Sequence, residues 1–191
     1  MVEATVALSD EQLVARTIDG DASAFNDLVA RWETSLYNFV YRHLGDSEEA
    51  RDICQEAFIR AYTNLHGFRG KAKFSSWLYQ IALNLCRSQF RRNKARPTVS
   101  LEEQSESRPL RLVRDPGHKP DETTLTNERA NLVRRALAEL SDLQRTVIIL
   151  KEYHGLKFRE IAEILGAPES TVKSRLYHGL EALAQSLGHL K

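Results

Sequence analysis

Residues 158–180 read FREIAEILGAPESTVKSRLYHGL, a pattern that indicates one short helix, a turn and a second helix. Gly166 suits the left-handed backbone conformation that ends many helices, and Pro168 prevents the first helix from continuing. Ala162 is small where two crossing helices must approach closely. Apolar residues at helical spacing predict the buried stripe of the second helix: Val172, Leu176, Leu180 and Leu183. The segment predicts a helix-turn-helix, whose second helix enters the DNA major groove, with a plain pair of packed helices as the alternative.

The outward face of this second helix carries polar and cationic side chains. A helical projection of about 100° per residue directs five of them outward: Ser170, Ser174, Tyr177, His178 and Glu181. Lys173 and Arg175 flank these five on either side. Hydroxyl and cationic groups near the start of such a helix could read base edges and hold phosphates.

Helical periodicity dominates the rest of the chain, and no convincing strand pattern occurs. A long amphipathic helix has apolar residues at spacings of three and four: Phe25, Leu28, Val29, Trp32, Leu36, Phe39, Val40 and Leu44. The next helix is expected to bury Ala50, Ile53, Cys54, Ala57, Phe58, Ala61 and Leu65. Three pairs have the spacing of a capping box at a helix start: Ser9 with Gln12, Asp46 with Glu49, and Ser141 with Gln144. The sequence therefore predicts an all-α fold.

Residues 97–125 interrupt the helical pattern. Four of the five prolines lie here, among few apolar residues: Pro97, Pro109, Pro116 and Pro120. Long structureless loops are uncommon inside a compact domain, so this segment predicts a flexible linker that permits many orientations of its neighbours. The expected organisation is two small helical domains, at residues 1–96 and 126–191, of which the second contains the helix-turn-helix.

The net charge of +1 conceals a strong separation of charge along the chain. Residues 1–56 carry 12 acidic and 4 basic residues, whereas residues 57–101 carry 9 Lys or Arg and no Asp or Glu. Solvated protein surfaces usually mix both signs. A block without carboxylates would concentrate positive potential where phosphates could be held.

Within this basic block, one predicted helix presents a polar stripe opposite its apolar side: Gln80, Asn84, Arg87 and Arg91. Tyr79, Phe90 and Arg92 border the stripe, and Lys71, Lys73 and Phe74 lie in the loop just before it. Cations can follow a nucleic-acid backbone while planar groups stack on bases, so this pattern favours single-strand binding. A solvated basic face with core aromatics is the alternative.

The preceding helix has an acidic outward side, formed by Glu48, Glu49, Asp52, Gln55 and Glu56. Two interpretations are equally compatible with this cluster. It is either a solvated acidic face or a docking surface for a basic partner.

Several functional classes are disfavoured by the sequence. No apolar run approaches the roughly 18 residues of a membrane span, and the N-terminus lacks a secretion signal, so a cytoplasmic protein without membrane insertion is expected. Cys54 and Cys86 have no CxxC pairing and are expected to be reduced. The six histidines are scattered and form no HExxH, P-loop or GxSxG arrangement. We therefore expect neither an enzyme nor a cofactor or metal site.

Two segments, DSEEARDICQEAFIRAY (residues 46–62) and FRGKAKFSSWLYQIALNLCRSQFRR (residues 68–92), resemble bacterial RNA polymerase sigma factors of the extracytoplasmic-function (ECF) group. SDLQRTVIILKEYHGLKFREIAEILGAPESTVKSRL (residues 141–176) resembles the second DNA-binding domain of the same family. The resemblance spans roughly residues 8–187 in the family's order. It implies a factor that binds core RNA polymerase and directs promoter-specific transcription initiation.

The resemblance also implies roles for individual residues. The face with Asp52, Gln55 and Glu56 would bind the coiled coil of the polymerase clamp. The loop at residues 69–74, which includes Arg69, and the Asn84 stripe would melt the minus-ten element and capture a flipped base of the non-template strand. The helix end from Thr171 to His178 would read the minus-thirty-five element as duplex. A cognate anti-sigma factor is a further implied partner.

The reading helix departs from the family pattern at two positions. Many relatives carry arginines where this chain has Lys173 and His178. Lys is a point charge without the planar fork of Arg, so the promoter consensus is not transferable. The competing hypothesis for the whole chain is a helix-turn-helix regulator that does not associate with core polymerase. That regulator would need a dimer seam, which the sequence does not show.

Overall fold

The computed structural model describes residues 8–70, 72–95 and 124–189, and within these ranges every regular element is helical. The elements in chain order are α1 (Asp10–Ile18), α2 (Ala22–Leu44), α3 (Ser47–Thr63), the 3-10 turn η1 (Leu65–Gly67), α4 (Phe74–Ala95), α5 (Thr124–Glu139), α6 (Asp142–Ile148), the π-helical turn η2 (Ile149–Tyr153), α7 (Phe158–Leu165) and α8 (Glu169–His189). The predicted all-α class is confirmed. In the part of the chain that is described, no helix is long and apolar enough to cross a membrane.

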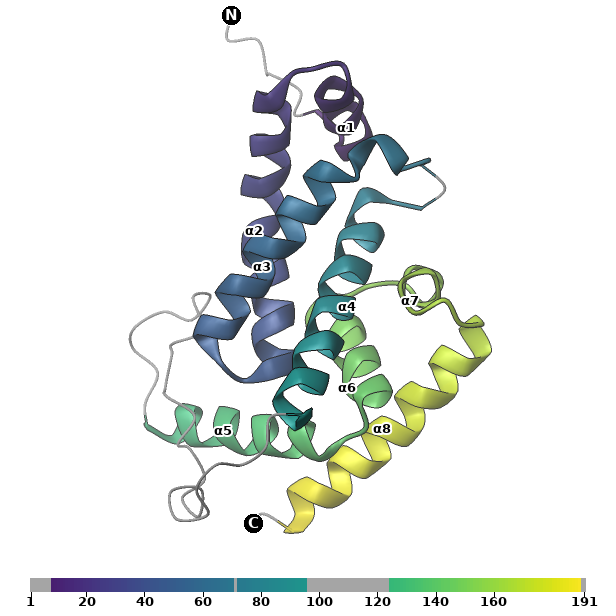
Figure 1. Cartoon of the computed structure of the whole chain (residues 1–191). Helices are drawn as coiled ribbons and strands as arrows, with labels where there is room; N and C mark the ends of the chain where they lie inside the picture. The colour runs from purple at the N-terminus through teal and green to yellow at the C-terminus, as the bar shows by residue number, and fades with distance from the viewer. Residues whose placement is uncertain (1–7, 71, 96–123, 190–191) are drawn as a thin grey trace, which may run out of the picture.

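The N-terminal half is a bundle in which α2, α3 and α4 pack side by side, with α1 across one end (Figure 1). Its core is made of the apolar stripes expected from the sequence. The most deeply buried side chains, each at most 2% exposed, include Leu28, Leu36, Phe39, Val40, Ala57, Ala61, Leu78 and Ala82. Burial of these stripes is the main source of stability for helices of this length.

The predicted caps set the helix starts. Ser9 and Ser141 form reciprocal capping boxes with Gln12 and Gln144 at the starts of α1 and α6. Asp46 caps α3 by accepting from the backbone N–H of Glu48 and Glu49, but the reciprocal bond of a capping box is not formed. Each such cap stabilises its helix by about 1 kcal/mol.

The C-terminal half folds as the predicted helix-turn-helix, with α7 and α8 joined by a short turn and supported by α6 (Figure 1). Gly166 ends α7 at φ 58°, which confirms the expected left-handed residue. Ile148, Ile161, Val172 and Leu176 are almost completely buried between these helices.

The predicted stripe of α8 is wrong at Leu180, which is 36% exposed. Gly179 occupies the inward position instead. A Cβ atom at Gly179 would lie 3.0 Å from Cδ1 of Ile148 and 3.2 Å from Cβ of Gln144. The stripe therefore shifts by one residue here, because α6 leaves little room for a side chain at position 179.

The two halves of the chain are packed against each other through α4 with α7 and through α2 with η2. The sequence predicts a linker at residues 97–125 that leaves the orientation of the two halves open. Most of that segment lies outside the described residues, and its last two residues belong to α5. The division into two domains with these boundaries stays a prediction.

Candidate nucleic-acid and protein-binding surfaces

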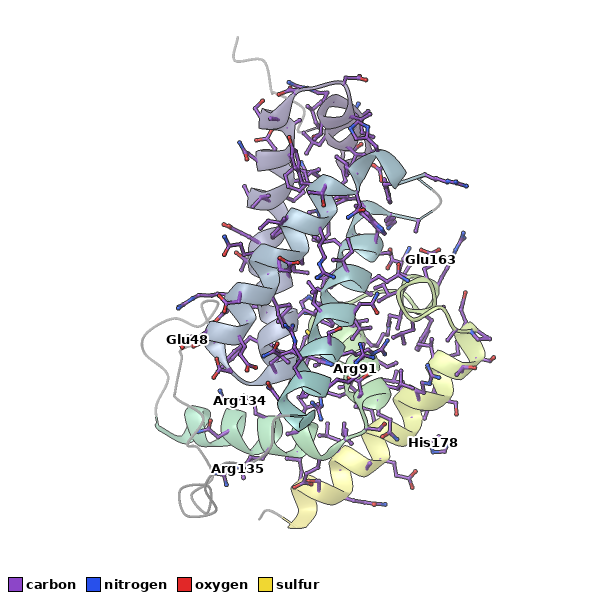
Figure 2. The ribbon with its side chains drawn as sticks, viewed as in Figure 1. Glu48, Arg91, Arg134, Arg135, Glu163 and His178 are labelled. Atoms are coloured by element: carbon purple, nitrogen blue, oxygen red, sulfur yellow. The ribbon has the colours of Figure 1, made fainter. Side chains whose placement is uncertain are left out.

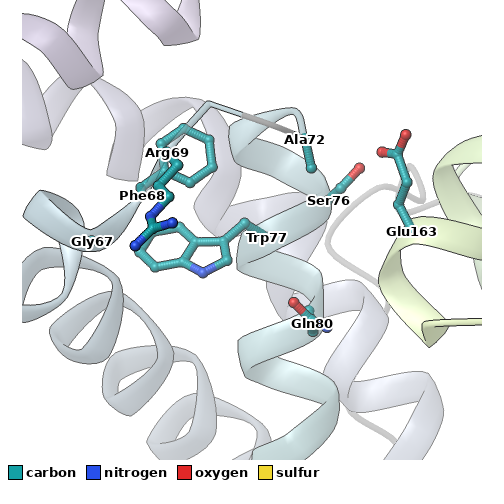
Figure 3. Close-up of a pocket in the computed structure, with 8 residues that line it drawn as sticks. All are labelled: Gly67, Phe68, Arg69, Ala72, Ser76, Trp77, Gln80 and Glu163. Carbon is teal, nitrogen blue, oxygen red and sulfur yellow. The ribbon is translucent and has the colours of Figure 1, made fainter.

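A small pocket lies where the loop after α3 meets the start of α4. Its volume is about 240 Å³, and it is lined by Gly67, Phe68, Arg69, Ala72, Ser76, Trp77, Gln80 and Glu163. The ring centres of Phe68 and Trp77 lie 5.1 Å apart in its wall, and Arg69 and Gln80 are exposed beside them (Figure 3). Aromatic surface next to a cation and an amide is the combination that binds an unpaired base. We call this the aromatic pocket.

Phe74 corrects one expectation. The sequence placed it among the DNA-binding residues of the loop, but its side chain is 0% exposed. It is the first residue of α4, and its ring packs 6.2 Å from Phe68 and 6.1 Å from Trp77. Phe74 therefore supports the rings of Phe68 and Trp77 from the buried side and cannot contact a nucleic acid. Lys71 lies outside the described residues.

The polar stripe of α4 continues from the pocket along one helix face. Gln80, Asn84, Arg91 and Arg92 are exposed, as a nucleic-acid surface requires. Arg87 is different, because its guanidinium Nε donates to Asp142 of α6 at 2.9 Å. Tyr79, expected at the border of the stripe, is instead only 2% exposed and belongs to the core.

Lys73 is the second basic residue of this surface with an acidic partner. Its Nζ lies 2.7 Å from Oε1 of Glu160 on α7. The hydrogen bond to Glu160 and the charge of that carboxylate raise the pKa of Lys73 above its ordinary value. Lys73 therefore stays fully charged and keeps 63% of its side chain exposed.

The acidic side of α3 is presented to solvent only in part as predicted. Glu48, Asp52 and Gln55 are exposed, and Glu56 accepts from Nε of Arg60 at 2.7 Å, one turn further along α3. Glu49 turns toward α4, where it accepts from Gln89 and Asn93. The exposed acidic face therefore consists of Glu48, Asp52 and Gln55, with half-buried Glu56 at its edge. Glu48 and His178 lie on opposite sides of the molecule in Figure 2.

Two apolar residues beside this face were missed by the sequence reasoning. Ile59 is 50% exposed and Tyr62 is 48% exposed. They line an open groove of about 570 Å³ between α2 and α3, together with Phe25 and Val29. A signal was available, since Ile59 follows Gln55 by one helical turn and so lies on the outward side of α3.

The outward end of α8 is exposed as expected. Ser170, Lys173, Ser174, Tyr177 and His178 are all exposed, while Thr171 and Arg175 are half-buried. Tyr177 exposes 69% of its surface, and Nζ of Lys173 lies 5.4 Å from the ring centre of Phe158. Polar groups thus extend outward along the first turns of the helix that would enter a groove.

Comparisons with known proteins show the family of this chain. Residues 28–96 match the family described as Sigma-70 region 2, and residues 130–183 match Sigma-70, region 4. The ECF RNA polymerase sigma factor SigW of Bacillus subtilis is 40% identical over 176 residues, which are 90% of this chain and 92% of that protein. This chain belongs to the ECF sigma factors. It is a sigma factor that directs transcription, and an unrelated helix-turn-helix regulator is not favoured.

Two solved structures share the fold of this sigma factor. One is the structure of CnrH in complex with the cytosolic domain of CnrY, with a TM-score of 0.68, 23% identity and coverage of 93% of this chain and 96% of that one. The other is the sigma factor RpoE in complex with the anti-sigma factor NepR from Bartonella quintana. Its TM-score is 0.66 at 23% identity, and 86% of this chain and 96% of that one are covered.

Proposed function

We propose that this sigma factor binds core RNA polymerase through α3, captures the non-template strand of the minus-ten element with α4, and reads the minus-thirty-five element with α8. The observation that carries the proposal is the aromatic pocket at the head of an exposed stripe of amide and arginine side chains. A duplex reader alone has no use for such a pocket, because bases become available for stacking only after they leave the duplex.

Strand capture divides between the pocket and the stripe. The pocket offers the rings of Phe68 and Trp77 to one base, and Asn84 on the next part of the stripe offers both a donor and an acceptor to another base edge. Arg91 and Arg92 are exposed further along α4, where they can hold phosphates. These contacts exist only with an unpaired strand, so they offset the cost of melting.

Reading of the upstream duplex belongs to the outward end of α8. Lys173, Tyr177 and His178 project from its first turns and can reach base edges in the major groove. Arg175 is half-buried, whereas the other three side chains are exposed, and it is suited to a backbone phosphate. This division predicts specificity from the first group and general affinity from Arg175.

Docking on polymerase belongs to the exposed acidic face and to the groove beside it. Asp52 and Gln55 provide charged and polar contacts, and Ile59 and Tyr62 provide apolar surface next to them. An apolar centre with a polar margin is the usual composition of a protein interface. We also propose a cognate anti-sigma partner, because NepR holds the structurally similar RpoE. A factor with these partners works in the cytoplasm and performs no catalysis itself.

Run-off transcription tests the whole proposal. A library of promoters is transcribed by core polymerase alone and by core polymerase with the sigma factor added. We expect transcripts with defined start sites only when both are present. A chain that binds upstream DNA but never produces such transcripts would be a regulator.

A substitution tests the docking face directly. Asp52→Lys should weaken capture of core polymerase strongly while helix content is kept, because exposed positions change the free energy of unfolding by no more than about 0.5 kcal/mol. Asp19→Lys is the matched control, since Asp19 is also exposed but lies at the end of α1, outside the acidic face. The measurement is a pull-down with core enzyme, with circular dichroism of each variant. Equal capture of both variants means that the acidic face is only solvated surface.

A further inference from the structure

An acidic side of α7 lies against the proposed strand-capture site. Glu160 binds Lys73 at 2.7 Å, and Glu163 closes the aromatic pocket from the far side (Figure 3). Both carboxylates come from the C-terminal half of the chain, whereas the groups they face come from the N-terminal half. Carboxylates therefore stand where the phosphates of a captured strand would have to pass.

A second contact covers the middle of the stripe. The carboxylate of Asp142 accepts from Nε of Arg87 at 2.9 Å through one oxygen and lies 2.8 Å from Nε2 of His43 through the other. His43 is 2% exposed, and Arg87 keeps only 32% of its side chain exposed. Asp142 thus holds together α2, α4 and α6.

A third contact lies deeper in the interface between the two halves, which we call the seam. The hydroxyl of Tyr79 on α4 lies 3.0 Å from Nδ1 of His154, the residue that follows η2. Nη1 of Arg145 on α6 also donates to the backbone carbonyl of His43 at 3.2 Å. These contacts pair buried polar atoms across two surfaces, which indicates a built interface, because an unmatched polar group costs free energy when it is buried. The pairing is incomplete, since Nδ1 of His43 and Nε2 of His154 are buried without a hydrogen-bond partner among the described residues.

We propose that this arrangement is a closed form of the sigma factor, in which the C-terminal helices mask the strand-capture site as an internal substitute for DNA. The proposal rests on the function proposed above for α4. Glu160 and Asp142 already pair with Lys73 and Arg87, so the two halves must separate before these two cations can contribute fully to strand binding. The exposed acidic face of α3 stays accessible in the closed form. Polymerase can therefore dock first and the masking helices leave afterwards.

Two variants weaken the seam without changing any residue of α4 or of the loop before it. Glu160→Gln combined with Glu163→Gln removes the charges of α7, and the amide oxygen introduced at position 160 can still accept from the backbone N–H of Lys157 as the carboxylate does. Asp142→Asn separately removes the charge between His43 and Arg87. Glu152→Gln combined with Asp19→Asn is the control for the first variant, since both residues are exposed and neither carboxylate makes an ion pair or side-chain hydrogen bond among the described residues.

Separation of the halves is measured by energy transfer between dyes on cysteines introduced at two exposed positions, Arg51 of α3 and Gln185 of α8. The native Cys54 and Cys86 do not compete for the dyes, because both are buried. Affinity is measured in the absence of polymerase, from the anisotropy of a labelled single-stranded oligonucleotide. If the closed form predominates about tenfold, opening it tightens binding by up to about tenfold.

We expect both seam variants to show a longer inter-dye distance and tighter oligonucleotide binding, and the control to show neither. A longer distance without tighter binding overturns the masking role. Tighter binding without a longer inter-dye distance would mean that the variants act only through their lost negative charge, and would overturn the closed form. No change in either measurement would also contradict the closed form. Failure of the proposed function is seen separately, as absence of promoter-specific run-off transcripts from the unaltered protein with core polymerase.

Discussion

At the scale of single residues, the amide of Asn84 is placed for a task that a charged side chain could not perform. It is exposed on α4 between the aromatic pocket and the arginines, and no other side chain of the described residues binds it in the closed form. An amide offers a donor and an acceptor without the long reach of a lysine, which suits the edge of one displaced base.

Asn84→Ala should therefore lose open promoter complexes while polymerase binding and closed complexes are kept. Extrusion of a base costs on the order of a few kcal/mol, and the contacts of Asn84 offset part of that cost. Permanganate footprinting of unpaired thymines on matched and pre-melted templates measures the defect, which should shrink on the pre-melted one. Asn93→Ala on the same helix is the control. Wild-type reactivity of Asn84→Ala on the matched template would leave α4 as a duplex-binding face.

At the scale of helices, α6 and α8 meet at Gly179 with too little room for a Cβ atom unless Ile148 or Gln144 shifts by a few tenths of an ångström. Gly179→Ala should destabilise the C-terminal half by about 1 kcal/mol. Overpacking against Ile148 costs about 1–3 kcal/mol, which exceeds the gain of about 1 kcal/mol in helix propensity. Gly188→Ala, in the same helix with nothing within 4 Å, should instead be neutral or stabilising. Chemical denaturation measures both, and a stabilised Gly179→Ala variant would show that α6 yields freely.

The outward end of α8 should determine which upstream sequence is used. Replacement of Lys173 or His178 by Ala should change the motif selected from randomised upstream elements, since a lost specific contact alters discrimination by roughly 1–3 kcal/mol. Replacement of Arg175 should weaken all sequences alike. Selection followed by sequencing distinguishes these cases. If the Lys173 and His178 variants return the wild-type motif, another surface reads the element.

Periodicity and caps predicted the elements well because both are local properties of the chain. The boxes at Ser9 and Ser141 and the left-handed Gly166 lie where the sequence indicated. Phe74 was misplaced because α4 begins one turn earlier than the apolar stripe suggested, which carries its ring inward. Leu180 was misplaced because periodicity cannot detect a helix contact made through a missing side chain.

The seam between the halves could not be predicted from spacing. His43 and Asp142 are 99 residues apart in sequence, and no local pattern joins them or the other partners across the seam. One indication existed. His43 follows Phe39 by one turn on the apolar stripe of α2, and a polar residue at a buried position needs a partner from elsewhere.

At the scale of the whole molecule, the closed form should depend on pH. Burial lowers the pKa of His154 to about 4, and the nearby Arg42 acts in the same direction. Burial also lowers the pKa of His43, between Asp142, Arg87 and Arg145. Both shifts favour the neutral imidazole in the closed form. As the pH falls below 6.5, the separated form takes up protons first, so the closed form loses stability progressively down to about pH 4.

The expected loss at His154 alone is on the order of 2–3 kcal/mol across this range. The inter-dye distance should therefore increase between about pH 7.5 and pH 5, on the acid side of the ordinary histidine pKa. His154→Gln keeps an acceptor for Tyr79 but does not titrate, so its distance should vary less with pH. A wild-type distance that stays constant down to about pH 5 would contradict the role of the buried histidines.

The aromatic cluster around Tyr79 joins the two halves through their cores as well as through their surfaces. The ring centre of Tyr79 lies 5.2 Å from that of Phe39 and 5.4 Å from that of His154. Rings packed this way lose their contacts together. The sigma factor should consequently melt as one cooperative unit in a calorimeter at neutral pH, and two separate transitions should appear once the seam is broken by Asp142→Asn. In a cell whose temperature rises, the unaltered protein would therefore lose both DNA-binding halves at the same temperature.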